Sequence, residues 1–307
     1  MAPLPRQRWH KEGLLFEAAG QRPWLRSHAA MPIVQRTGPE ALRVYISARD
    51  EHNRAHIGWC DVETDGAWRV RAVTDTPCLS PGALGTFDDS GVTGACVVDV
   101  GDETYLYYSG WSHGVTVPFY LGIGLALSRD GGRSFTRVSA APILDRDDTD
   151  PYLTASPFVL VETGVWRMWY VSGSRWTVEH GAPKHYYRIK YAESADGLRW
   201  RRPNVICIDY ASPHEHAMAR PCVVKDGSTY RMWFSARGDR YRLGYAESSD
   251  GITWTRDDSA VDLDVSSAGW DSEMMAYPFV LEHAGRLVML YNGNGYGRSG
   301  VGYAIVL

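Results

Sequence analysis

The feature that most constrains the fold is a segment that recurs along the chain. Residues 220–256 read RPCVVKDGSTYRMWFSARGDRYRLGYAESSDGITWTR, and related segments lie both upstream and downstream of it. The segment holds four apolar or alternating stretches of β-prone residues, separated by Asp-Gly turns and one polar loop, and this pattern predicts four strands. One copy alone could not bury the apolar faces of its strands. We therefore expect the copies to pack against one another.

The copies share a spacing between the first and the second predicted strand. Three pairs of residues are separated by 12 positions: Ala95 and Tyr107, Pro157 and Trp169, and Pro221 and Trp233. Close variants begin near Pro32 and Pro278, so that five copies start near residues 28, 88, 150, 214 and 271. A period of about 60 residues with four strands per copy is typical of a β-propeller.

We predict an all-β protein, a five-bladed β-propeller of four-stranded antiparallel blades that forms a single domain over residues 1–307. The last copy offers three strands, so residues 1–27, which contain GLLFEAAG, are expected to supply the fourth strand and close the ring. A tandem of immunoglobulin-like domains is the alternative. It is disfavoured because no linker separates the copies and no Cys-Trp-Cys spacing recurs.

Composition and charge exclude several classes of partner. The net charge is −4, and the charged residues are interspersed, so neither a nucleic acid nor a membrane surface is an expected partner. The first 20 residues hold no apolar run of signal-peptide length, which predicts a cytoplasmic protein. The five cysteines are scattered without a CxxC pair and are expected to be buried free thiols. We expect no cofactor.

Strand direction assigns the loops to two faces of the predicted ring. The Asp-Gly turns lie on one face, where they are hairpin residues rather than catalytic groups. The loops of the other face are longer and rich in Trp, His, Arg and Gly, which is where function is expected. The candidate substrate-binding residues from this face are His28, Asp89, Trp111, His113, Trp176, His216, Arg220, Arg237, Tyr277 and Tyr296.

Ionisable residues recur five to seven positions before the start of the first strand of each copy. They include Asp88, Asp150, His214 and Asp271 at seven positions, Asp89 and Glu215 at six, and His216 and Glu273 at five. In a closed ring these side chains would surround one funnel, where crowding of like charges raises some carboxyl pKa values. A protonated and an ionised carboxyl group are what hydrolysis of a glycosidic bond requires. We therefore expect Glu215 or Glu273 as acid, Asp88 or Asp150 as base, and Asp271 as a further candidate.

Each of these carboxylates also has a structural interpretation. Asp150 precedes a proline and could cap a turn, and Asp88 could form an Asx turn. Asp271 follows Trp270 and could lock the crossover between two copies. Glu215 alternates with His214 and His216 in an extended stretch, so that either the histidines or Glu215 face the funnel.

The strands SPFVL, RPCVV, YPFVL, RMWYVSG, RMWFSAR, RIKYAES and LGYAES resemble those of the five-bladed propeller glycoside hydrolases. This group contains arabinanases, β-xylosidases, invertases and mannoside phosphorylases, and the resemblance extends from about residue 28 to residue 307. It implies a carbohydrate-active enzyme. Hydrolases of the group place a carboxylate one or two residues before the first-strand proline. Here those positions hold Ala30 and Met31, Thr93 and Gly94, Ala155 and Ser156, Ala219 and Arg220, and Ala276 and Tyr277.

Since none of these is a carboxylate, the catalytic trio of the group does not carry over. Arg220 suggests either binding of an anion or a bridge to a funnel carboxylate. Three functions are therefore open: hydrolysis of a glycosidic bond, binding of a sugar without hydrolysis, and another reaction such as that of a lyase or cyclase. A small molecule or an oligosaccharide is the expected ligand. Metal-assisted chemistry by His28, His113, His180, His185, His214 or His216 is disfavoured, because these histidines form no short ligand motif.

Overall fold

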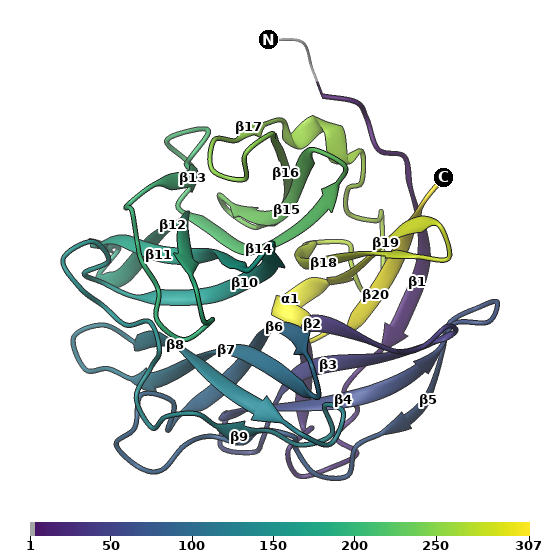
Figure 1. Ribbon diagram of the computed structural model, residues 1–307, viewed down its shortest axis with the longest axis horizontal. Coiled ribbons are helices and arrows are strands. Elements are labelled where there is room, and N and C mark those ends of the chain that lie inside the picture. Colours follow the sequence, from purple (N-terminus) through teal and green to yellow (C-terminus); the bar gives the residue numbers. More distant parts are fainter. Residues whose placement is uncertain (1–3) are drawn as a thin grey trace.

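The computed structural model describes residues 4–307 and confirms the all-β class (Figure 1). The first two groups of strands along the chain are β2 (Ser27–Gly38), β3 (Ala41–Arg49), β4 (Ala55–Glu63) and β5 (Arg69–Val73), followed by β6 (Gly91–Val100), β7 (Glu103–His113), β8 (Phe119–Ser128) and β9 (Thr136–Arg137). The next two are β10 (Thr154–Glu162), β11 (Val165–Glu179), β12 (Ala182–Ser194) and β13 (Ile206–Ile208), then β14 (Ala217–Asp226), β15 (Thr229–Arg237), β16 (Tyr241–Ser248) and β17 (Thr255–Arg256).

The last group joins the two ends of the chain. It contains β18 (Ala276–His283), β19 (Arg286–Asn292) and β20 (Val301–Val306), and β1 (Trp9–Phe16) pairs antiparallel with β20. Figure 1 shows β1 beside β20. The short helical segments are η1 (Asp258–Val261) and α1 (Asn294–Gly297). Within residues 4–307, no helix has the length and apolar character that crossing a membrane requires.

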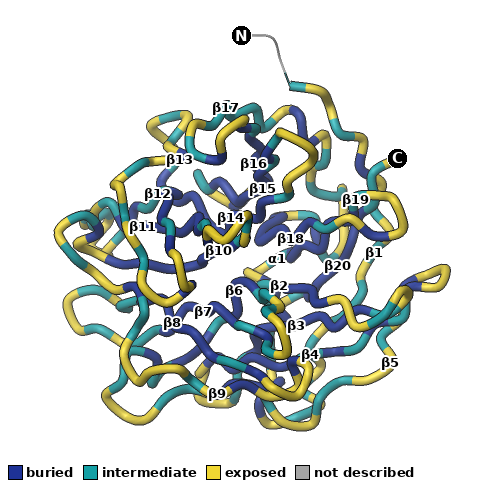
Figure 2. Tube along the Cα trace, in the orientation of Figure 1, coloured by how far each residue is buried: buried dark blue, intermediate teal, exposed yellow. Residues whose placement is uncertain are grey.

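Neighbouring groups of strands touch through few backbone bonds. Groups one and two share a sheet through the parallel pair Ala55 and Gly91, and groups three and four do so through Tyr187 and Ala217. The first strands of the groups contact one another in a cycle, in which β2 touches β6, β6 touches β10, β10 touches β14, β14 touches β18 and β18 touches β2. These strands are buried over most of their length (Figure 2). Side chains rather than sheet hydrogen bonds therefore hold the groups together.

The Asp-Gly turns connect each group to the preceding one. The Gly251 amide donates a hydrogen bond to Ser248 Oγ (2.8 Å), and Asp250 accepts from the amides of the next two residues. The Gly251 carbonyl then accepts the indole N–H of buried Trp169, 82 residues earlier (2.8 Å). These aspartates hold turns, as hairpin chemistry requires. All five cysteines are free and buried, which confirms that prediction.

A β-bulge interrupts four of the first strands just before a proline. The residue before the proline has a positive φ in each: 55° at Met31, 45° at Ser156, 54° at Arg220 and 59° at Tyr277. The register of the strand pair shifts at the same places. Such a conformation is uncommon for residues other than glycine, and it turns the side chain out of the regular alternation of the strand. Met31, Ser156 and Tyr277 thereby reach a central cavity.

Side chains of adjacent groups bind the backbone at three of these bulges and at Gly94, the equivalent residue of β6. At three positions the acceptor is a serine hydroxyl: the Ser156 amide donates to Ser109 Oγ (2.8 Å), the Tyr277 amide to Ser235 Oγ (2.7 Å) and the Gly94 amide to Ser47 Oγ (3.0 Å). At the fourth position the Met31 amide donates to Asn292 Oδ1 (2.7 Å). The four acceptors lie at equivalent positions of second strands and are buried. Because they satisfy amides that the irregular register removes from the ladder, they stabilise the strained backbone at the cavity.

Candidate functional site

The central cavity has a volume of about 320 Å³ and lies where the first strands begin. Its polar lining consists of four hydroxyl groups, two imidazoles and two guanidinium groups, from Ser47, Thr93, Ser109, Ser156, His28, His185, Arg49 and Arg237. Its aromatic lining is contributed by Trp111, Phe119, Tyr187, Tyr241, Tyr277 and Tyr296. Among residues 4–307, no aspartate or glutamate lines it.

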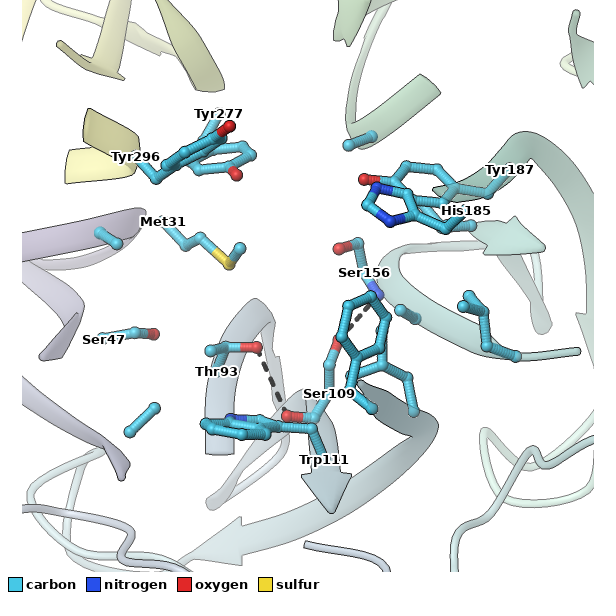
Figure 3. Close-up of a pocket in the computed structure, with 18 of the residues that line it drawn as sticks. Met31, Ser47, Thr93, Ser109, Trp111, Ser156, His185, Tyr187, Tyr277 and Tyr296 are labelled. Carbon is cyan, nitrogen blue, oxygen red and sulfur yellow. Dashed lines mark hydrogen bonds between the residues drawn. The ribbon is translucent and has the colours of Figure 1, made fainter. Parts of the chain in front are cut away.

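Aromatic side chains form opposite walls of the cavity. Figure 3 shows Tyr277 and Tyr296 on one side and His185 with Tyr187 on the other. The rings of His185 and Tyr187 are stacked, with centroids 4.9 Å apart and an interplanar angle of 5°. This pair follows from sequence, since residues two apart in β12 point to the same side of the strand. The flat walls offer apolar faces with polar edges, which suits an amphipathic ring.

Tyr296 is the most exposed of these rings, with 40% of its surface accessible. It lies in α1, where Gly295 and Tyr296 have positive φ values of 63° and 61°. The segment is anchored by Asn294, whose side-chain oxygen accepts the amides of Glu273 (2.7 Å) and Met274 (3.1 Å). The strained turn thus presents an aromatic ring at the opening of the cavity.

The two guanidinium groups of the cavity have no carboxylate partner within the described chain. Arg237 lies 5.5 Å from the ring centroids of both Tyr241 and Tyr296, and its Nε is buried without a hydrogen-bond partner. Arg49 donates one hydrogen bond to Asn53 Oδ1 at 2.8 Å. Burial lowers the pKa of Arg49, which remains a cation at neutral pH.

The two histidines of the cavity are uncharged near neutral pH. Burial, with additional repulsion from Arg49 and Arg298, lowers the pKa of His28 to about 4. Burial also lowers the pKa of His185 to about 4, and His216 and Arg237 add to this effect. A neutral imidazole donates one hydrogen bond and accepts another. His28 uses Nδ1 for Ser27 Oγ at 2.9 Å, which leaves its Nε2 for a ligand.

The predicted ring of aspartates around the cavity is corrected by the structure. Asp88, Asp150 and Asp271 are at most 1% exposed and do not line the cavity. Each accepts a hydrogen bond from the tyrosine that lies 20 residues later, namely Tyr108, Tyr170 and Tyr291. Each also pairs with basic side chains: Asp88 with Arg137, Asp150 with Lys190 and Arg202, and Asp271 with Lys11. They lie at the crossovers between groups of strands, which agrees with the structural interpretation of these residues.

The two glutamates also lie outside the cavity lining. Glu215 forms a two-pronged ion pair with Arg256, with distances of 2.7 and 2.9 Å. Burial raises the pKa of Glu215, but hydrogen bonds from Arg256 and the Ala211 amide outweigh it, and the net pKa is lowered. Glu273 is exposed and pairs with Arg240. The expected rise of carboxyl pKa values is not found for Glu215, because its neighbours are cations rather than other carboxylates.

Of the ten predicted substrate-binding residues, five line the cavity and five do not. The cavity includes His28, Trp111, Arg237, Tyr277 and Tyr296. Asp89 instead accepts hydrogen bonds from Gly85 and Ser90, and His113 is exposed beside Trp111. Trp176 packs against Phe119 and His185 from behind, and buried His216 binds the carbonyls of His185 and Gly238 (3.2 Å each). Trp176 and His216 therefore support the wall rather than form it.

Arg220 does not bridge to a carboxylate within the described chain. Its guanidinium is buried and donates to the carbonyls of Gly94 (2.9 Å), Ala95 (3.0 Å) and Pro32 (3.0 Å). Burial lowers its pKa to about 10, so that the group is charged at neutral pH. The side chain therefore ties β14 to β2 and β6 through backbone carbonyls.

Several cavity residues were missed by the sequence analysis. Arg49, Phe119, Tyr187 and Tyr241 were not predicted, although Arg49 is the second residue of the loop at 48–56 and Tyr241 is the last residue of the loop at 235–241. Arg49, Phe119 and Tyr241 stand at strand ends beside the long loops, and that position was the available signal. Tyr187 lies inside β12. Residues 4–307 contain no group of three or more His, Cys, Asp or Glu side chains arranged to hold a metal ion.

Two proteins of Mycobacterium tuberculosis are related to the chain over nearly its whole length. They are the uncharacterized proteins MT1551 and Rv1502, from two strains, each 41% identical over 298 residues that cover 97% of this chain and 99% of the relative. The chain belongs to the family of these two proteins. No protein-family model matches it.

Solved structures of glycoside hydrolases share the fold. One glycoside hydrolase has a TM-score of 0.72 at 18% identity, with 98% of this chain and 92% of the hydrolase covered. A thermostable family-43 glycoside hydrolase has a TM-score of 0.65 at 18% identity, with coverage of 91% and 89%. An endo-arabinase from Bacteroides thetaiotaomicron VPI-5482 has a TM-score of 0.61 at 12% identity, with 96% of both chains covered. The resemblance to propeller glycoside hydrolases is confirmed as one of fold.

Proposed function

We propose that the chain is a single five-bladed propeller whose central cavity binds a carbohydrate. The cyclic contacts among β2, β6, β10, β14 and β18 support five blades, and the pairing of β1 with β20 supports closure of the ring by residues 1–27. The fold shared with glycoside hydrolases supports a carbohydrate as the ligand. Ligand sites in such folds lie where loops gather at one end of a rigid scaffold.

The observation that carries the proposal is the aromatic lining of the cavity. Rings on opposite walls can sandwich the apolar C–H faces of a sugar, while the hydroxyls and neutral imidazoles bind its hydroxyl groups. A volume of about 320 Å³ falls at the lower end of the range for small-ligand sites and suits one or two sugar rings.

Binding without hydrolysis is the function that this geometry supports best. Hydrolysis by paired carboxylates requires both groups beside the scissile bond. The cavity residues within 4–307 include no carboxylate, and Asp150 and Glu215 are engaged by cations elsewhere.

Hydrolysis of a glycosidic bond is the second candidate, and one observation favours it. Glu273 has an exposed side chain, and its backbone amide is bound by Asn294, two residues from Tyr296 of the cavity. A rotation of this side chain away from Arg240 could bring a carboxylate to the opening. Turnover of aryl glycosides by the wild type, and its loss in Glu273→Gln, would establish this activity.

Calorimetric titration with a panel of mono- and oligosaccharides tests the proposed function. We expect at least one saccharide to bind, and Tyr296→Ala to weaken its binding about tenfold or more through loss of a stacking surface. Tyr152→Ala is the matched control. It removes the same kind of side chain, which is 38% exposed in Tyr152, from a position outside the cavity. A panel without binding, or equal affinities for the two variants, would contradict the proposal.

A further inference from the structure

We infer that the saccharide bound in the cavity carries a negatively charged group, a carboxylate or a phosphate, held by Arg49 and Arg237. This inference rests on the proposed function and adds the charge of the ligand. It starts from the observation that both guanidinium groups face the same cavity. The described chain supplies neither of them with a carboxylate partner.

Several internal arginines of this protein pair with a carboxylate. Arg137 pairs with Asp88, Arg202 with Asp150, and Arg256 with Glu215. Arg220, which lacks such a partner, uses three backbone carbonyls instead. Cations removed from water are costly unless their donors are satisfied. Arg49 and Arg237 therefore differ from these internal arginines, because each retains donor groups and neither pairs with a carboxylate of the described chain or with a set of backbone carbonyls.

Arg237 has a buried donor from which no group of the described chain accepts a hydrogen bond. It ends β15, and its guanidinium stands 5.5 Å from the rings of both Tyr241 and Tyr296. Its Nε is shielded from water, yet it has no acceptor. A buried donor without an acceptor is destabilising, and a ligand oxygen that reaches it removes this penalty. These two neighbouring rings help to hold the planar group in place for such an acceptor.

Arg49 reaches the cavity from the end of β3. Asn53 accepts from one of its terminal nitrogens, which orients the guanidinium and leaves other donors free. Both guanidinium groups line the cavity that Tyr277 also lines.

The charge of the cavity comes from these two residues. His28 and His185 are uncharged near neutral pH, and no carboxylate of the described residues lines the cavity to compensate Arg49 and Arg237. Guanidinium groups match carboxylate and phosphate oxygens with paired, charge-assisted hydrogen bonds. A sugar acid or a sugar phosphate supplies such oxygens together with a ring for the aromatic walls.

Matched sugars test the inference on the complete chain. Glucose, galactose and mannose are each compared with the corresponding 6-carboxylate and 6-phosphate by calorimetry at constant ionic strength. We expect at least one charged member to bind about tenfold or more tightly than its neutral parent. The carboxylate and phosphate arms distinguish the two sources of charge. Raising the salt concentration is expected to weaken binding of the charged member and to leave the neutral parent unaffected.

Variants assign the effect to the two arginines. Arg237→Met and Arg49→Met are each expected to reduce the preference for the charged sugar about tenfold, while binding of the neutral parent changes little. Arg129→Met removes the same charge from an exposed arginine outside the cavity and is the control. If one of these variants fails to fold, the salt dependence of binding to the wild-type chain still tests the inference.

The outcomes separate this inference from the proposed function. If neutral sugars bind as tightly as charged ones, or if the preference survives both substitutions, the cavity binds saccharides but the inference is overturned. If no sugar of either kind binds, both statements fail. A preference lost in the cavity variants and kept in Arg129→Met supports both.

Discussion

Single carboxylates stabilise the junctions between neighbouring groups of strands. Asp150 is fully buried and accepts hydrogen bonds from Tyr170 (2.8 Å), Lys190 (3.0 Å) and Arg202 (3.0 Å). Burial raises its pKa, but hydrogen bonds from Ser172, Lys190 and Tyr170 outweigh burial and lower it. Asp88 and Asp271 occupy the same place at two other junctions.

We predict that Asp150→Asn lowers the free energy of unfolding by about 3–5 kcal/mol, because Lys190 loses its buried carboxylate partner and Arg202 retains only the half-buried Asp147. Asp226→Asn is the control, since Asp226 pairs with Arg231 at the surface and is expected to contribute at most about 1 kcal/mol. Urea unfolding followed by tryptophan fluorescence measures both. Equal losses in the two variants would show that the buried pair is not a main source of stability.

The same variant has a predicted pH dependence. Because the folded-state pKa of Asp150 is lowered, its ionised form stabilises the fold fully above the ordinary aspartate pKa. This contribution is lost as the pH falls through the folded-state value. The difference in unfolding free energy between wild type and Asp150→Asn should therefore be constant above about pH 5 and should shrink as the pH falls from about 4 toward the lowered folded-state pKa. A difference that stays constant over this fall in pH would contradict the role of the charge.

At the scale of elements, the bulged first strands determine the shape of the cavity. The bulge turns Tyr277 into the cavity, and the backbone there depends on Ser235 of β15, whose hydroxyl accepts the Tyr277 amide at 2.7 Å. Ser235 is fully buried, so that no water replaces it. One hydroxyl group of one strand thus positions a side chain of the next.

We expect Ser235→Ala to lower the free energy of unfolding by about 1–3 kcal/mol, because the Tyr277 amide loses its acceptor. Saccharide binding should weaken as well, since Tyr277 moves. Ser228→Ala, in the exposed turn of the same hairpin, should change stability by less than about 0.5 kcal/mol. Chemical denaturation and calorimetry measure the two effects. Wild-type stability in Ser235→Ala would exclude the hydroxyl as the support of the bulge.

For the whole molecule, the decisive contact is the one between the two ends of the chain. β1 pairs with β20, Lys11 of β1 pairs with buried Asp271 at 2.7 Å, and Gln7 accepts the indole N–H of Trp233 at 2.9 Å. The first strand of the chain thereby covers the last strand and also contacts the fourth group. An exposed edge at β20 would be open to pairing with other chains.

A chain that lacks residues 1–17 is expected to lose at least about 3–5 kcal/mol of unfolding free energy, since Asp271 is left unpaired, and to aggregate through β20. Replacement of the exposed His10 and Glu12 by Ala keeps the backbone of β1 and should cost less than about 1 kcal/mol in total. Denaturation and light scattering provide the readouts. A truncated chain that is monomeric and as stable as the wild type would refute closure by the N-terminal segment.

Local sequence patterns predicted the all-β class, the resemblance to propeller glycoside hydrolases and the turn role of residues such as Asp250, because these depend on alternation, spacing and Asp-Gly chemistry within a few residues. The same patterns placed Trp111, Arg237 and Tyr296 among the cavity residues, since unusual loops marked the functional face.

Local sequence patterns could not predict which group each charged side chain pairs with. Asp150 meets a lysine 40 residues later and an arginine 52 residues later, and Arg220 meets carbonyls more than 120 residues away. The sequence by itself determined which strands form and which loops share a face. Tertiary structure alone decided that the carboxylates are buried with cations and that two arginines face the cavity, because ion pairing depends on distances between segments that only the folded chain brings together.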